Sequence, residues 1–297
     1  MTLIVGIICK EAIVLAADSQ TTKGIAKQPG THKIHEIEFA NGCALVAESG
    51  SASLSNAVIQ LFQNKAIGVT IENELTIAKT AEASIREIRN SLTSLHPTCT
   101  DGITWQSFFL EQINYFELMV AYYFECKPCL YKLNPVWCIP IPASSYFMTS
   151  GIASDLANYI LHEQAEPQMD SELASVIAIK VVEDAIEYVE GCGSPTRAAL
   201  IRTPYNTAKA PLIEHPFAGL AHLWEDPIVI FPQEKVEDIA RIIAGVEKQM
   251  RTNQKREIHK SLRAQTDELL KSLCGELSPE TLAKLKEMEP NYEAGTE

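Results

Sequence analysis

The chain has 297 residues, enough for one large domain or for a domain with an appendage. Hydrophobic residues make up 46% of it and charged residues 21%, as in ordinary soluble globular proteins. The formal net charge is −13. An acidic surface repels phosphate backbones and anionic headgroups, which disfavours nucleic acid and membrane surfaces as partners.

The start of the chain lacks the basic segment of a signal peptide, and no apolar run approaches the roughly 18 residues that would span a bilayer. We therefore expect a cytoplasmic protein. Its eight cysteines are scattered, and the pair Cys126 and Cys129 has no second ligand pair nearby. We expect a hairpin turn there, with no metal site and no cofactor.

Strands are predicted for the first fifty residues. Apolar, β-branched runs at 3–9 and 12–17 predict a hairpin of buried strands. Residues 34–39 and 43–48 predict a second pair around the turn dipeptide Asn41-Gly42.

The hydrophobic period then changes to that of a helix, from Leu54 to Phe62 and again over 73–94. The elements predicted after these two helices are strands at 116–124, 129–133 and 145–149, helices at 153–164 and 171–190, and a strand at 197–202. Strands and helices in separate blocks favour two packed sheets with helices outside. We predict an α+β fold, a four-layer α-β-β-α sandwich, over residues 1–232.

A helical extension is predicted for residues 233–297. Its apolar residues recur at helical spacing, as at Val236, Ile239, Ile242 and Ile243. Such a stripe would suit a contact with a neighbouring subunit or the gating of a chamber, and deletion of 233–297 should then change the oligomer.

Chemistry is expected at Thr2. A small second residue permits removal of Met1, which would give one residue both a hydroxyl and a free α-amine. An α-amine has a pKa of about 7.7–8.0 and suits a general base near neutral pH. Such an amine can activate the otherwise weak threonine nucleophile.

Three other positions are predicted to converge on Thr2. Asp18 follows the second strand, Lys33 precedes the third, and Gly50 stands where a strand meets a helix. Taken singly, Asp18 could be a turn residue and Lys33 a solvated charge. Taken together they favour an active site, because a lysine lowers the pKa of a nearby hydroxyl and a strand-to-helix N–H suits an oxyanion.

These segments resemble the proteasome β-subunit family, including the bacterial Anbu type and the β-proteobacterial proteasome homologues. The resemblance runs from Thr2 to about Ile201. The motifs that carry it are Thr-Leu-Ile-Val-Gly-Ile, Ala-Ala-Asp-Ser-Gln-Thr-Thr, Lys-Ile-His-Glu-Ile, Glu-Ser-Gly-Ser-Ala, Cys-Leu-Tyr-Lys-Leu-Asn-Pro and Thr149-Ser150-Gly151.

The resemblance implies a threonine endopeptidase, an N-terminal-nucleophile (Ntn) hydrolase that cleaves unfolded proteins or peptides inside a ring-shaped homo-oligomer. It implies Thr2 as nucleophile, tuned by Lys33 and Asp18, with the Gly50 N–H on the oxyanion and Ser150 holding the amine and a water. It also implies a substrate pocket, whose expected members are Thr21, Thr31, Glu48 and Ala52. A carboxylate at Glu48 would favour basic side chains.

One part of the family pattern is altered here. The family supplies a further Asp and Ser, three residues apart, after its fourth helix, whereas this chain has Glu190 and Ser194, four apart. These two could substitute in the base network. A small-molecule Ntn amidase and a catalytically silent ring scaffold remain alternatives, and an ATPase or activator partner is left open.

Overall fold

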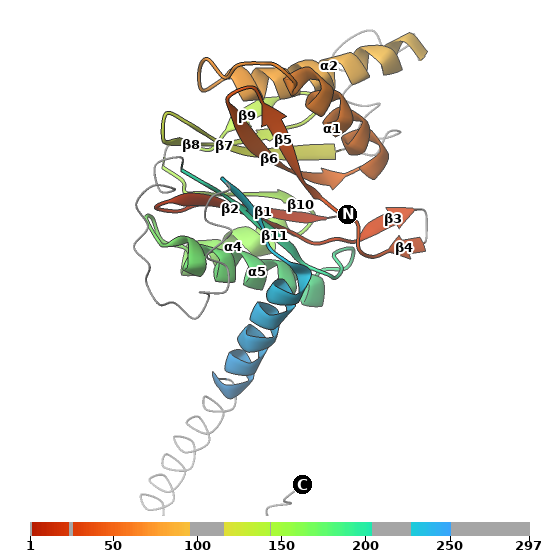
Figure 1. Ribbon diagram of the computed structural model, residues 1–297. Coiled ribbons are helices and arrows are strands. Elements are labelled where there is room, and N and C mark those ends of the chain that lie inside the picture. The colour runs from red at the N-terminus through yellow and green to blue at the C-terminus, as the bar shows by residue number, and fades with distance from the viewer. Residues whose placement is uncertain (1, 24–25, 96–115, 143, 204–226, 251–297) are drawn as a thin grey trace, which may run out of the picture. The chain divides into compact units, whose positions relative to one another are not determined.

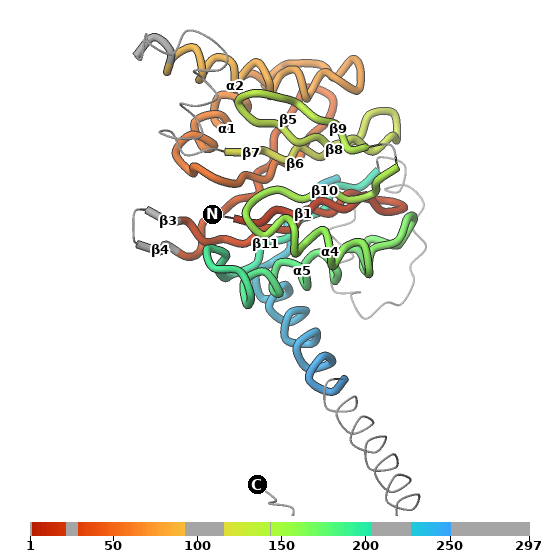
Figure 2. The backbone as a smooth tube through the Cα atoms, turned by 180° about the vertical axis from the view of Figure 1, so that it is seen from behind, coloured from red at the N-terminus to blue at the C-terminus, as the bar shows by residue number. Residues whose placement is uncertain are grey.

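The computed structural model describes residues 2–23, 26–95, 116–142, 144–203 and 227–250. Two antiparallel five-stranded sheets lie face to face, with a layer of helices outside each (Figure 1). The view from behind in Figure 2 shows the same four layers. The predicted α-β-β-α sandwich is therefore confirmed.

The first sheet has the strand order β10-β1-β2-β11-β12. Its strands are β1 (Leu3–Ile8), β2 (Ala12–Ala17), β10 (Phe147–Gly151), β11 (Arg197–Arg202) and β12 (Ile228–Ile230). In the central strands almost every residue is buried, because one face meets the second sheet and the other meets helices.

The second sheet has the order β5-β6-β7-β8-β9. Its strands are β5 (Ile34–Phe39), β6 (Gly42–Gly50), β7 (Phe116–Phe124), β8 (Lys127–Leu133) and β9 (Cys138–Pro140). The turn between β7 and β8 consists of Glu125 and Cys126, both with positive φ. A separate two-stranded hairpin joins β3 (Thr21–Lys23) to β4 (Ala26–Gln28).

Helices α1 (Ala52–Ala66) and α2 (Thr76–Leu95) cover the outer face of the second sheet (Figure 1). Helices α4 (Ser154–Gln164) and α5 (Ser171–Tyr188) cover the first sheet. α5 begins where the Asp170 side chain accepts a hydrogen bond from the Leu173 N–H, an N-cap that satisfies one free donor of the first turn.

Among the described residues, one hydrophobic cluster joins the second sheet to its helices and another joins the two sheets. One lies between the second sheet and α1 and α2, with Phe62 and Tyr122 fully buried in it. The other lies between the sheets, where Ile4 and Leu15 of the first sheet share a cluster with Ala47 and Met119 of the second. Successive residues of a strand face opposite sides of the sheet. Residues two positions from Ala47 or Met119 on the same strand therefore also face the gap between the sheets.

The predicted strands and helices up to residue 202 are all found, with shifts of a few residues at their ends. The largest shifts are at helix ends, since α1 continues to Ala66, past the expected Phe62, and α2 begins at Thr76, after the expected residue 73. Strand β10 was expected at 145–149 and is found at Phe147–Gly151. Four short strands were not predicted: β3, β4, β9 and β12. Each has three residues, too few for an alternating pattern to be recognised.

The predicted extension is helical over residues 233–250, and its continuation lies outside the described residues. Met1–Arg241 and Ile242–Glu297 are two separate compact units. The predicted domain boundary at 232/233 stays a prediction. Among the described residues, no helix is both long and apolar enough to cross a membrane.

Candidate active site

Thr2 stands immediately before β1, and 3% of it is exposed. Its carbonyl oxygen accepts a hydrogen bond of 3.0 Å from the Ile152 N–H. Gly151, with φ of +105°, passes so close that a Cβ atom there would lie 1.8 Å from the Thr2 carbonyl oxygen. The backbone of Thr2 is thus held by β10, and the contact requires glycine at 151.

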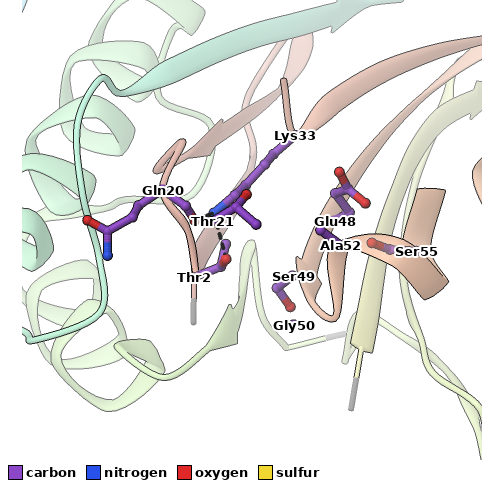
Figure 3. Close-up of a pocket in the computed structure, with 9 residues that line it drawn as sticks. All are labelled: Thr2, Gln20, Thr21, Lys33, Glu48, Ser49, Gly50, Ala52 and Ser55. Atoms are coloured by element: carbon purple, nitrogen blue, oxygen red, sulfur yellow. Dashed lines mark hydrogen bonds between the residues drawn. The ribbon is translucent and has the colours of Figure 1, made fainter. Parts of the chain in front are cut away.

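Lys33 points its ammonium group at the Thr2 hydroxyl (Figure 3). The Lys33 Nζ lies 2.6 Å from Thr2 Oγ1, 3.2 Å from Asp18 Oδ1 and 2.6 Å from the Gln20 carbonyl oxygen. Three acceptors match the three donors of a protonated amine. Burial lowers the pKa of Lys33, and Asp18 opposes that shift.

Asp18 is fully buried and fixed by the backbone. It accepts hydrogen bonds from the N–H groups of Leu3, Gln20 and Gly193, at 2.9, 3.2 and 3.1 Å. These bonds and the ion pair with Lys33 fix the position of both carboxylate oxygens. Asp18 is therefore held in contact with the lysine that meets Thr2, and its role in tuning the site stays a prediction.

Gly50 ends β6, one residue before the Ser51 N-cap of α1, and has φ of +90°. It lines a pocket with Thr2 and Lys33. The strand-to-helix junction is therefore beside the Thr2 hydroxyl, and its oxyanion role stays a prediction.

The pocket has about 240 Å³ of free space, including space open to solvent. Its lining residues are Thr2, Gln20, Thr21, Lys33, Glu48, Ser49, Gly50, Ala52 and Ser55 (Figure 3). Thr31 is tied to this wall, because the Thr21 hydroxyl donates to Thr31 Oγ1 at 2.8 Å. All four predicted pocket residues thus lie at the pocket or in direct contact with it.

Glu48 is a buried acid in this wall. Its Oε1 lies 3.4 Å from His35 Nε2, while its Oε2 is buried without a hydrogen-bond partner among the described residues. A buried carboxylate oxygen in that state is poised for a donor from a ligand.

Ser150 lies on β10 opposite Ile4 and is 1% exposed. Its hydroxyl is 3.0 Å from that of Ser49, which lines the pocket, and it also donates a hydrogen bond to Glu117. Ser150 is thereby connected to the pocket through Ser49.

Glu190 and Ser194 are exposed. The loop between them reaches the site through its backbone, where the Gly193 N–H binds Asp18 and the Gly191 carbonyl accepts from Gln20 Nε2 at 3.3 Å. The structure therefore brings the loop to the site but leaves the two predicted side chains at its surface. Their part in the base network stays a prediction.

The residues at or near the site that the sequence analysis missed include Gln20, Ser49, Ser55, Glu117 and Cys192. Gln20 and Ser49 adjoin the motif residues, so their positions were a usable signal. Burial and Asp18 raise the pKa of the Cys192 thiol to about 11, which keeps it protonated and poorly nucleophilic. Among the described residues, no group of three or more His, Cys, Asp or Glu side chains is arranged to hold a metal ion.

A family model described as proteasome subunit matches residues 2–94, the segment that carries Thr2, Asp18, Lys33 and Gly50. No curated protein matches the chain.

Three solved structures share the fold at low identity. The Gly-1 mutant of Anbu from Hyphomicrobium sp. strain MC1 is 14% identical with a TM-score of 0.60, and the match covers 85% of this chain and 99% of that one. The helical assembly of the Anbu complex from Pseudomonas aeruginosa is 16% identical with a TM-score of 0.58, covering 84% and 95%. Anbu (ancestral β-subunit) from Yersinia bercovieri is 13% identical with a TM-score of 0.55, covering 67% and 81%. The fold is therefore of the proteasome type, and the resemblance to that family is confirmed.

Proposed function

We propose that this chain is a threonine peptidase of the N-terminal-nucleophile class, with Thr2 as nucleophile after removal of Met1. The observation that carries the proposal is the 2.6 Å contact between Lys33 Nζ and Thr2 Oγ1 inside a lined pocket. A buried lysine that contacts a hydroxyl stabilises the alkoxide that forms as the hydroxyl loses its proton.

In the proposed reaction, the freed α-amine of Thr2 takes the Oγ proton through a water, and Oγ attacks the peptide carbonyl carbon. The Gly50 N–H holds the resulting oxyanion. The ammonium returns its proton to the leaving amine, which leaves an acyl ester on Thr2. A water molecule then cleaves the ester and restores the free hydroxyl, and Ser150 positions the amine and water throughout.

A peptide epoxyketone tests this proposal, because it needs both the threonine hydroxyl and the free amine. We expect the intact mass to show loss of Met1 and one adduct per chain, with none in Thr2→Ala. A processed Thr2 terminus that stays unlabelled would rule out an autonomous peptidase and favour the silent scaffold. Labelling without cleavage of peptides, but with cleavage of small acyl amides, would favour the amidase.

We also propose that the chain self-associates and works as a ring-shaped homo-oligomer, which would restrict substrates to unfolded proteins and peptides. Support for self-association comes from the Pseudomonas aeruginosa Anbu structure, which is a helical assembly. Exposed apolar residues on the C-terminal helical segment provide a surface for such contacts.

A further inference from the structure

Glu117 is a buried acid that the proposed reaction does not yet use. It lies on β7 directly opposite Ser49 of β6, and 9% of it is exposed. Ser49 is two residues from Ala47 on β6, and Glu117 is two residues from Met119 on β7; Ala47 and Met119 belong to the cluster between the sheets. Glu117 and Ser49 therefore face the first sheet, from which Ser150 meets them.

The hydrogen bonds of this group have a fixed direction. Ser150 donates its single proton to Glu117 Oε2, so the 3.0 Å contact between Ser49 Oγ and Ser150 Oγ must be donated by Ser49. Because the Ser150 hydroxyl donates its proton to Glu117, it can only accept hydrogen bonds from its other neighbours. One lone pair accepts the Ser49 proton, and the other can accept a hydrogen bond from one further donor.

The donor that the proposed reaction places there is the Thr2 amine. An amine whose N–H groups are held by acceptors has its own lone pair aimed in a defined direction, as a general base requires. Without Glu117, the Ser150 proton could point at the amine and compete for that lone pair. The carboxylate excludes that orientation.

On the basis of the proposed function, we infer that Glu117 is a positioning residue that fixes Ser150 as an acceptor for the Thr2 amine. It would act in place of the acid expected in the loop after α5, where Glu190 is exposed. The base network is then completed from the second sheet, not from that loop.

A double-mutant cycle between Glu117 and Ser150 tests the inference. The substitutions Glu117→Leu and Glu117→Ala both remove the acceptor, the first without leaving a large cavity. We expect each, like Ser150→Ala, to lower kcat for a fluorogenic peptide about tenfold to a hundredfold with little change in KM, because the loss is of orientation and not of substrate binding. Because Glu117 acts through Ser150, the double variant should be no slower than Ser150→Ala alone.

Glu117→Gln keeps an acceptor oxygen and should retain activity to within about threefold of the parent, a rescue that a general loss of structure would not give. The control is Glu163→Gln, an exposed acid on α4, which should leave kcat unchanged. The melting temperature is recorded for every variant, to separate slow from unfolded enzyme.

The outcomes distinguish the two proposals. A parent enzyme that neither cleaves peptides nor reacts with the epoxyketone would overturn the proposed function, and Glu117 with it. An active parent with folded Glu117 variants at full speed would overturn the Glu117 role alone. The Glu117 role would also be overturned if the losses of kcat in the single variants multiplied in the double variant. It would be overturned as well if only Glu190→Gln lowered kcat, because the positioning residue would then lie in the loop after α5.

Discussion

Lys33 and Asp18 form a buried ion pair with 5% and 0% of their side chains exposed. The pair connects the sheets, because Asp18 follows β2 of the first and Lys33 precedes β5 of the second. Removing one member of a buried pair leaves an uncompensated charge, whereas removing both leaves none. Single and double substitutions can therefore separate the effect of the pair on stability from its effect on the reaction at Thr2.

Lys33→Met should destabilise the protein by about 3–5 kcal/mol, because Asp18 loses its cation while still buried. Adding Asp18→Asn should recover part of that loss in chemical denaturation. Labelling of Thr2 by the epoxyketone should stay at least about a hundredfold slower in both variants, since neither restores the contact with Oγ1. Recovery of labelling in the double variant would contradict the role of the Lys33 charge.

Glu48 has a buried carboxylate oxygen without a partner among the described residues, in the wall of the pocket. A basic substrate side chain would satisfy it with a charge-assisted hydrogen bond worth about 1.5–3 kcal/mol. We expect Glu48→Ala to lower the ratio of kcat/KM for peptides ending in Arg over those ending in Leu by about tenfold or more. Glu38→Ala, an exposed acid on β5, is the matched control. An unchanged ratio in Glu48→Ala would refute the preference.

At the scale of elements, Thr2 is positioned by the pairing of β1 with β10. Leu3 pairs with Gly151, and the next residue, Ile152, holds the Thr2 carbonyl. The positive φ of Gly151 and its closeness to Thr2 make that pairing intolerant of any side chain.

Gly151→Ala should therefore shift β10 or the start of β1 and destabilise the protein by about 2 kcal/mol or more, from backbone strain and overpacking together. Labelling of Thr2 should fall with it. Gly245→Ala provides the contrast, because its Cβ would meet nothing within 4 Å and it stands in helical backbone. Chemical denaturation and epoxyketone labelling of both variants check the expectation, and a Gly151→Ala protein with parental stability would contradict it.

Local patterns were sufficient for the longer elements and for placing Lys33 and Gly50 at strand ends. The Asn41-Gly42 turn and the apolar runs predicted β5 and β6 to within two residues, and the ends of these strands put Lys33 and Gly50 in place. Glu117 could not be found this way. Its contact with Ser150 depends on β6 pairing with β7 in one register and on the two sheets meeting, and neither is encoded in spacing along the chain.

At the scale of the whole molecule, the helical residues 233–250 carry exposed apolar side chains. Ile242, Val246 and Met250, four residues apart, are 66%, 50% and 57% exposed. Residues four apart lie on one side of a helix, so these three form a continuous stripe. Large exposed apolar side chains in a row are typical of a surface that another molecule covers.

If that surface joins copies of the chain, Ile242→Glu with Val246→Glu should lower the sedimentation coefficient of the assembly. Ala244→Glu with Lys248→Glu is the control, since both positions lie on the other side of the helix and the change in charge is greater. Sedimentation velocity on the full-length parent and both double variants measures the size of each assembly. An assembly unchanged by the first pair would exclude this stripe as the contact.

The residues of the candidate site are divided between the two sheets, with Thr2, Asp18 and Ser150 in or beside one and Lys33, Ser49 and Glu117 in or beside the other. Neither sheet alone holds both the Thr2 hydroxyl and the Lys33 ammonium group that contacts it. Under the proposed function, reactivity at Thr2 requires the two sheets to be packed on each other, because the Lys33 contact with Thr2 Oγ1 spans them. A copy in which the sheets have not yet met should then be unable to cleave its neighbours.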